Sequence, residues 1–424
     1  MSEARARAGA KTRKSFKARL RQLQGFIKKN KFDPLLIKKV DWLLIGLVLA
    51  VSLFGVVCIF AATGTTIIPR PSSIWRMIQL QSKYHAMLQL LWTALGMVVM
   101  GIFMYFSYQF LSTYSNAIYW GNIILLTVVL FMRAGRGSMS GWFYIGTRTF
   151  QPSEIAKLAI VITLAKWFSE RKTPVNNIRS LLQALAYVGL PLVLILLQPD
   201  FGTALVYLAI FAVMMFLSGL DWKLLIGVII LAAVVVVPLW NYLINAEEVS
   251  FRLTRILIFL DPSSDPDSAR QITNAKIAIG SGGLWGKGLF ANGSFAVLDY
   301  IPDDHTDFIF SIVGETFGFV GAGALILAYL IMIIRMTAMS SSAGDSFGTY
   351  LTIGIMAMML FHIVENICMV MGLLPVTGIP LPFISYGGSN MLTNYAGIGI
   401  VMNVYMRRFE VRVSTSQVRP QISI

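Results

Sequence analysis

Long apolar segments recur along this 424-residue chain, and they limit its possible folds more than any other feature. Each is close to the ~20 residues that an α-helix needs to cross the hydrocarbon core of a bilayer. Hydrophobic residues make up 56% of the chain and charged residues only 13%, a composition that excludes an ordinary soluble domain. We therefore expect an all-α polytopic integral membrane protein.

The apolar segments predict about ten transmembrane helices. One long connection, at about residues 246–305, separates the seventh span from the eighth and is predicted to be extracytoplasmic. Connections of this length are usually functional. The expected spans are residues 42–62, 85–107, 116–132, 153–168, 180–197, 200–218, 222–245, 306–335, 347–373 and 383–406.

Basic residues are concentrated at the two ends of the chain. Residues 1–41 form a basic arm and residues 407–424 a basic tail, and these flank a predicted membrane domain at 42–406. Because Lys and Arg favour the cytoplasmic side of membrane proteins, both termini are predicted to be cytoplasmic. A basic arm also suits nucleic acid or an anionic membrane surface. Topology explains it more simply, and we expect no nucleic-acid partner.

A short acidic run, from Asp299 to Asp307, ends the long connection and leads into the eighth span. Asp307, Ser311 and Glu315 are spaced i, i+4 and i+8, which predicts one polar stripe along that helix. A polar stripe in a membrane faces a cavity or a partner helix. Asp307 is either a helix cap or a general base, and because Thr306 can cap the helix equally well, its carboxylate is left for chemistry.

Two further polar clusters lie inside predicted spans, where charges are costly and are usually paired or functional. Glu154 and Lys157, spaced i and i+3, predict either a buried ion pair or a contact with substrate. His362, Glu365 and Asn366 share one face of the ninth span. An interhelical hydrogen-bond network is expected there, with a proton path as the alternative.

Two loops also carry candidate chemistry. Asp200 lies in a tight polar turn between two spans, and the segment 277–288 is rich in glycine and contains Lys287. This second loop lacks the spacing of a Walker motif, so nucleotide binding is not expected. Its glycines would allow the backbone to approach a pyrophosphate closely.

Five motifs follow one another along the chain: Gln151–Lys157, Gln198–Thr203, Ala278–Gly283, His305–Phe310 and Pro375–Gly388. Together they resemble the SEDS family of membrane proteins, which includes RodA, FtsW and SpoVE. The resemblance extends over residues 42–406, and the glycines around Lys287 look most like those of the RodA branch.

This resemblance implies a peptidoglycan glycosyltransferase in the bacterial cytoplasmic membrane. Such an enzyme polymerises lipid II into glycan strands beside a class B penicillin-binding protein, a transpeptidase that cross-links them. Other membrane proteins of the elongation or division complex are further expected partners. A role in cell elongation is expected, with division or sporulation left open.

The family's activity depends on the aspartate that corresponds to Asp307. The reaction needs a base for the attacking sugar hydroxyl and cations for the departing pyrophosphate. The sequence indicates no certain cofactor. A divalent cation (Mg or Mn) could help the basic residues to bind the departing pyrophosphate. The other residues assigned to substrate are Trp142, Glu154, Lys157, Asp200, Arg252, Arg255, Lys276, Lys287, His305, Thr306, Glu315 and Ser385.

Two other functions fit a polytopic protein with polar groups in its spans. One is a lipid II flippase or another lipid transporter, and the other is a non-catalytic scaffold for the penicillin-binding protein. The sequence shows no inverted repeat, and no broken helix beyond the segment near Pro380, which argues against the transporter. The scaffold leaves Asp307 and Glu315 unexplained.

Overall fold

A computed structural model describes residues 34–63, 83–132, 141, 143–145, 148–171, 178–198, 200–219, 258–261, 266–298, 300–302 and 304–409. The expected seventh span, most of the basic arm and most of the tail lie outside these described residues. Elsewhere the described helices match the expected spans to within a few residues at most ends.

Helices make up most of the described chain, with one small β-hairpin that the sequence did not predict. In the hairpin, Phe143 pairs with Phe150 in antiparallel register. The elements are η1 (Pro34–Lys39, a 3₁₀ helix), α2 (Trp42–Ala62), α4 (Tyr84–Tyr105), α5 (Gln109–Thr113), α6 (Ser115–Met132), β1 (Phe143–Ile145), β2 (Arg148–Phe150), α7 (Pro152–Ser169), α8 (Ile178–Leu197), α9 (Phe201–Leu217), α12 (Pro266–Ser281), α13 (Ile309–Ser341), α14 (Ser346–Val370) and α15 (Gly388–Met406).

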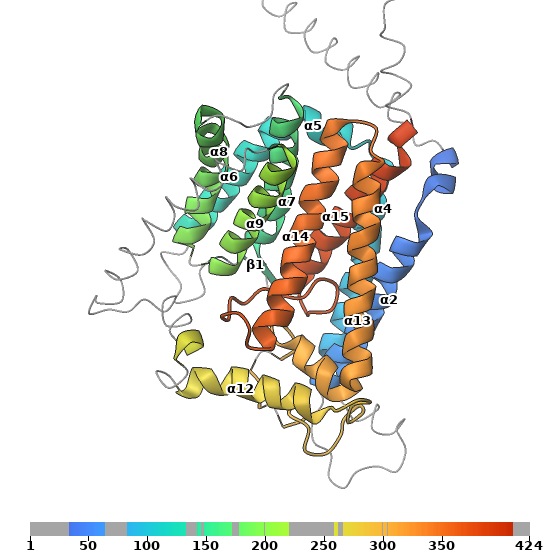
Figure 1. Ribbon diagram of the computed structural model, residues 1–424, viewed down its shortest axis with the longest axis vertical. Coiled ribbons are helices and arrows are strands. Elements are labelled where there is room, and N and C mark those ends of the chain that lie inside the picture. Colours follow the sequence, from blue (N-terminus) through green and yellow to red (C-terminus); the bar gives the residue numbers. More distant parts are fainter. Residues whose placement is uncertain are drawn as a thin grey trace, which may run out of the picture.

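The helices form a bundle in which α14 and α15 lie between two groups (Figure 1). Helices α6 to α9 are on one side, and α2, α4 and α13 on the other. Helix α12, which belongs to the long connection, lies across one end of the bundle. Within the described residues, α2, α4, α8, α13 and α14 are long and apolar enough to cross a membrane, and α6 and α9 are shorter apolar helices.

Helix α15 is almost entirely buried in the bundle, and it holds the end of α4 through Asn403. The Asn403 amide donates to the carbonyls of Phe103 and Met104, at 2.7 and 2.9 Å, and also to that of Phe106. Its oxygen accepts from the amide of Tyr108 at 3.1 Å. The last carbonyls of a helix have no partner within it, so Asn403 satisfies groups that would otherwise be buried without a hydrogen bond.

Replacing Asn403 with Leu should therefore destabilise the bundle. The substitution leaves buried carbonyls unpaired, at ~1–3 kcal/mol for each group that finds no water. We expect the melting temperature in detergent to fall by several degrees. Asn116→Leu, the same change at an exposed position of α6, is the control. Equal melting temperatures for the two variants would contradict this role of Asn403.

Helix α13 is broken at Gly318, whose backbone angles are φ 66° and ψ −164°. This conformation is open mainly to glycine. The glycine loop, residues 282–288, lies against the break and replaces lost helical hydrogen bonds. The bonds run from Phe319 N to Gly283 O (2.8 Å), Val320 N to Leu284 O (3.1 Å), Lys287 N to Glu315 O (2.9 Å) and Gly288 N to Thr316 O (3.0 Å).

The glycines of this loop allow its backbone to touch α13. A Cβ at Gly282 would lie 2.0 Å from the Gly314 carbonyl oxygen, and one at Gly286 would lie 2.2 Å from that of Thr316. At these two glycines the close approach is to α13, and the predicted approach of this loop to a pyrophosphate stays a prediction. The sequence failed to predict the break, since a glycine alone does not reveal one.

Gly286→Ala should destabilise the protein more than Gly288→Ala does. Both residues have positive φ, 82° and 83°, so alanine pays a similar conformational penalty of about 1–2 kcal/mol at each. Only the Gly286 Cβ meets backbone, while nothing lies within 4 Å of the Gly288 position. The overlap should add ~1–3 kcal/mol, measured as a larger fall in melting temperature. Equal falls would show that the close contact is unimportant.

Candidate functional site

Asp307 lies in the acidic turn, residues 304–308, immediately before α13. The prediction that Asp307, Ser311 and Glu315 form one helical stripe is wrong, because α13 begins only at Ile309. Phe308, and neither Thr306 nor Asp307, occupies the N-cap position. Asp307 is partly exposed, while Ser311 and Glu315 are buried. The turn is thus a separate structure from the helix that follows it.

The backbone of the acidic turn is held by two distant segments. Its carbonyls accept hydrogen bonds from α14 and from the segment 375–387, which leads into α15. Bonds at consecutive residues fix the path of the turn and therefore the direction in which the Asp307 side chain leaves it. The bonds run from Tyr386 N to His305 O (2.9 Å), Ser385 Oγ to Thr306 O (2.6 Å) and Asn366 Nδ2 to Asp307 O (2.7 Å).

Ser385 is fully buried behind this turn. Its hydroxyl donates to Thr306 and accepts from the amide of Leu381 at 2.7 Å. Its carbonyl accepts from the side chain of Gln89 in α4 at 3.1 Å. Both the hydroxyl and the carbonyl are thus engaged within the protein, and Ser385 positions the turn from the inside.

Glu365 of α14 directly precedes Asn366, whose side chain binds the Asp307 carbonyl. One oxygen of Glu365 accepts from the hydroxyl of Thr377, and the other is buried without a hydrogen-bond partner among the described residues. The sequence carried no signal that Glu365 would lie near the acidic turn, because the two belong to different segments.

His305 lies in a cluster of rings beside the acidic turn. Its ring centroid is 5.3 Å from that of His85 in α4 and 5.7 Å from that of Tyr386. Its Nδ1 is 3.3 Å from a carboxylate oxygen of Asp304. Nothing in the sequence indicated that His85 would lie here, since that residue is more than two hundred positions away.

Glu315 and Lys287 form an ion pair in the structure, at 2.7 Å. The same carboxylate accepts from the amides of Phe295 at 2.9 Å and Ala296 at 3.2 Å. Glu315 therefore organises the loop between α12 and α13. Lys287 remains a candidate for pyrophosphate, but a phosphate must compete there with a buried carboxylate.

Lys157 is buried, with 2% of its surface exposed, and lies between two acceptors. Its ammonium is 2.8 Å from a Glu154 carboxylate oxygen and 2.8 Å from Nε2 of His362 in α14. His362 Nδ1 is 2.6 Å from the Met358 carbonyl, so this nitrogen carries the proton and Nε2 accepts from Lys157. The predicted ion pair is confirmed, and it extends to a histidine that the sequence placed in another cluster.

This arrangement predicts a specific pattern of stability. Lys157→Met leaves the Glu154 charge buried and unpaired, which costs about 3–5 kcal/mol. The double variant Glu154→Gln/Lys157→Met removes that charge and should recover much of the loss. Melting temperatures of both variants in detergent test this. A double variant as unstable as Lys157→Met would contradict it and favour a loss of packing as the cause.

Asp200 joins two of the motifs. It is the N-cap of α9, and it accepts from the amide of Thr203 at 3.0 Å. Its second oxygen accepts from Ser153 at 2.8 Å and Gln151 at 3.1 Å, both at the start of α7. The backbone amide of Gln151 in turn donates to the hydroxyl of Ser389 in α15 at 3.1 Å. Motifs far apart in sequence therefore meet where these three helices begin.

The structure shows few or no contacts for the remaining residues that were predicted to bind substrate. Lys276 is exposed on α12, with its side chain near Gly372 beyond the end of α14. Trp142, Arg252 and Arg255 lie outside the described residues. Within the described part of the chain, no group of three or more His, Cys, Asp or Glu side chains could hold a metal ion.

The fold and these motifs define a multi-pass membrane protein with an acidic turn held at one end of its helix bundle. The family described as "FTSW_RODA_SPOVE: Cell cycle protein" matches residues 41–410. The chain belongs to this family.

Two relatives illustrate the similarity of this chain to other proteins of the family. Peptidoglycan glycosyltransferase MrdB of Escherichia coli K12 is 35% identical over 316 residues, which are 74% of this chain and 84% of that protein. Stage V sporulation protein E of Bacillus subtilis is 32% identical over 371 residues, covering 86% of this chain and 96% of that one.

Solved structures share the fold. A chain from the structure described as "Structural coordination of polymerization and crosslinking by a peptidoglycan synthase complex" matches with a TM-score of 0.70 and 29% identity, covering 88% of this chain and 99% of that one. The rod shape determining protein RodA of Thermus thermophilus matches with a TM-score of 0.61 and 27% identity, covering 87% and 98%.

Proposed function

We propose that the chain is a peptidoglycan glycosyltransferase that polymerises lipid II at the outer face of the bacterial cytoplasmic membrane. The relative from Escherichia coli is named for this activity. The observation that carries the proposal is the acidic turn, in which Asp307 is partly exposed and its backbone is fixed by bonds from α14 and the segment before α15.

In the proposed reaction Asp307 takes the proton from the sugar hydroxyl that attacks the anomeric carbon of the lipid-linked donor. The bond from that carbon to the pyrophosphate breaks as the new glycosidic bond forms. A positioned general base contributes about 10²–10⁴ to the rate.

Basic residues of the long connection would bind the departing pyrophosphate. The candidates are Lys276, Lys287, Arg252 and Arg255, with Lys157 as a buried alternative. A divalent cation, Mg²⁺ or Mn²⁺, would be held by phosphate oxygens of the substrate together with Asp307 or loop acids such as Asp261 and Asp265. When bound, it would offset charge on the leaving group.

Asp307→Asn should abolish polymerisation of lipid II by the purified protein and leave its melting temperature almost unchanged. The amide keeps the size of the side chain but cannot accept the proton. Asp304→Asn, which alters a neighbouring carboxylate paired with His305, should lose much less activity. Long glycan is measured after incubation in detergent without any other synthase. Polymerisation at the wild-type rate by Asp307→Asn would exclude Asp307 as the base.

The break in α13 keeps a lipid transporter as a second candidate, because broken helices often form transport sites. The same protein in vesicles distinguishes the candidates. Movement of labelled lipid II across the bilayer without polymer would support a flippase, and neither activity would support a scaffold.

We further propose a role in elongation, as in the RodA branch, with division and sporulation as alternatives. The expected partner is a class B penicillin-binding protein, since one matching structure is of a synthase complex that couples polymerisation with crosslinking. In the proposed topology both termini are cytoplasmic, and α12 and the acidic turn lie outside, at the opposite end of the bundle (Figure 1).

A further inference from the structure

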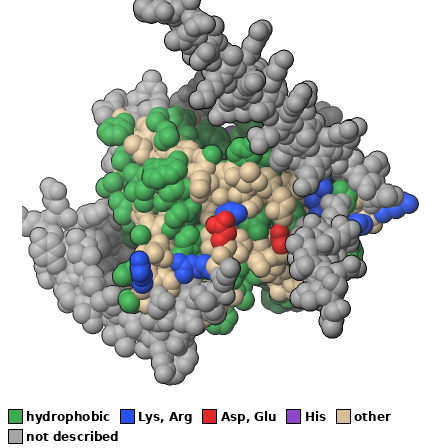
Figure 2. Space-filling view, turned by 90° about the horizontal axis from the view of Figure 1, so that it is seen from above, with side chains coloured by type: hydrophobic (Ala, Val, Ile, Leu, Met, Phe, Trp, Pro, Cys, Tyr) green, Lys and Arg blue, Asp and Glu red, His purple; other side chains and the backbone are tan. Residues whose placement is uncertain are grey.

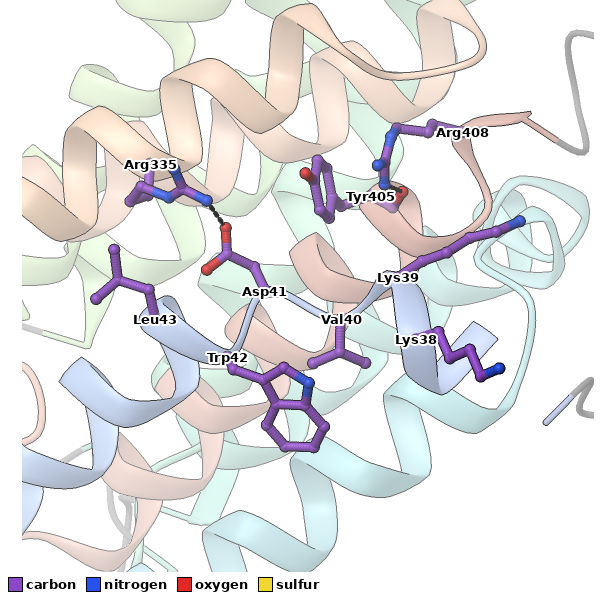
Figure 3. A pocket seen from close by; sticks show the side chains of 9 residues that line it. All are labelled: Lys38, Lys39, Val40, Asp41, Trp42, Leu43, Arg335, Tyr405 and Arg408. Atoms are coloured by element: carbon purple, nitrogen blue, oxygen red, sulfur yellow. Dashed lines mark hydrogen bonds and ion pairs between the residues drawn. The ribbon is translucent and has the colours of Figure 1, made fainter. Parts of the chain in front are cut away.

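A pocket of about 340 Å³ lies at the end of the bundle opposite α12, far from the acidic turn. It is formed where η1 meets α2, together with the late part of α13 and the end of α15 (Figure 3). Figure 2 looks onto this end of the molecule and shows Lys and Arg side chains on both sides of the face. None of the residues lining the pocket belongs to the proposed glycosyl-transfer site.

The pocket carries an excess of positive charge. Lys38, Lys39, Arg335 and Arg408 line it, and among the described lining residues Asp41 is the only carboxylate. Four cations and one anion leave an excess of three positive charges. Asp41 is already engaged, because one oxygen accepts from the amide of Leu44 in the first turn of α2 and the other pairs with Arg335.

The cations are partly arranged in advance. The Arg408 guanidinium lies 3.7 Å from the ring centroid of Tyr405, and its Nη1 donates to the Tyr405 carbonyl at 2.6 Å. In Figure 3, Lys38 and Lys39 extend from η1 on the same side of the view as Arg408 and away from Asp41 and Arg335. Held guanidinium groups with free N–H donors are suited to phosphate oxygens.

The pocket also borders an apolar surface. Trp42 and Leu43, the first residues of α2, are 64% and 54% exposed. Exposed tryptophan at the end of a membrane-spanning helix is typical of the lipid–water interface. A ligand with a charged head and an apolar body would therefore fit better than a small soluble anion.

We propose that this pocket binds the phosphate of an anionic phospholipid headgroup, with the acyl chains lying along the start of α2. In the proposed topology the lipid belongs to the cytoplasmic leaflet, whose anionic lipids attract basic segments. The bound phosphate would neutralise neighbouring cations contributed by η1, α13 and α15, and would thereby stabilise the packing of these segments. A ligand that binds only the folded protein raises its melting temperature.

The test uses the purified full-length protein in a neutral detergent. Phosphatidylglycerol, phosphatidylcholine and inorganic phosphate are each titrated, and binding is followed by the melting temperature and by native mass spectrometry. Only phosphatidylglycerol should stabilise the wild-type protein. Equal stabilisation by inorganic phosphate would overturn the assignment to a lipid, and equal stabilisation by phosphatidylcholine would overturn headgroup recognition.

Variants separate the pocket from general surface charge. Lys38→Gln/Arg408→Gln removes two pocket cations, whereas Lys166→Gln/Arg179→Gln removes two cations outside the pocket at the same end of the bundle. The apparent affinity for phosphatidylglycerol should fall by about tenfold or more in the first variant and much less in the second. Equal losses would show a diffuse electrostatic attraction and overturn the proposal. Melting temperatures without lipid report whether each variant is folded.

Discussion

The lack of water in the core of a bilayer is the constraint on which this structure depends, because each backbone polar group there needs a partner within the protein. The break in α13 at Gly318 is possible only because the glycine loop supplies donors and acceptors to it. Helix α4 can end inside the bundle because Asn403 donates hydrogen bonds to its last carbonyls. In both places, a second segment supplies the hydrogen-bond partners that the irregular backbone lacks.

At the candidate site, too, a second segment supplies hydrogen-bond partners to irregular backbone. The acidic turn interrupts regular structure just before α13, and its carbonyls are satisfied by Asn366, Ser385 and the amide of Tyr386. These bonds make the turn rigid, and rigidity is what a general base needs in order to meet a sugar hydroxyl in one geometry. The motifs at the starts of α7 and α9 meet through Asp200 and so support the same bundle from within.

Much of the fold could be predicted from the sequence, but the contacts of the site could not. Apolar segments located the described spans closely, whereas the start of α13 was misplaced because no glycine or proline within residues 304–308 marks the turn that precedes it. Lys157 and Glu154 were paired correctly, since their spacing of three residues brings them together on one helix. The contacts of His362 with Lys157 and of Glu365 with Thr377 were not predicted, because each joins two different segments.

The sequence by itself determined that the chain is an apolar helical membrane protein and that Asp307 belongs to a distinctive acidic motif. Both properties are local, since they depend on composition and spacing along a single segment. Only the tertiary structure decided which carboxylates are engaged. Glu315 pairs with Lys287, while Glu365 accepts from the hydroxyl of Thr377. These partners lie on different segments, and packing of the helices brings them together.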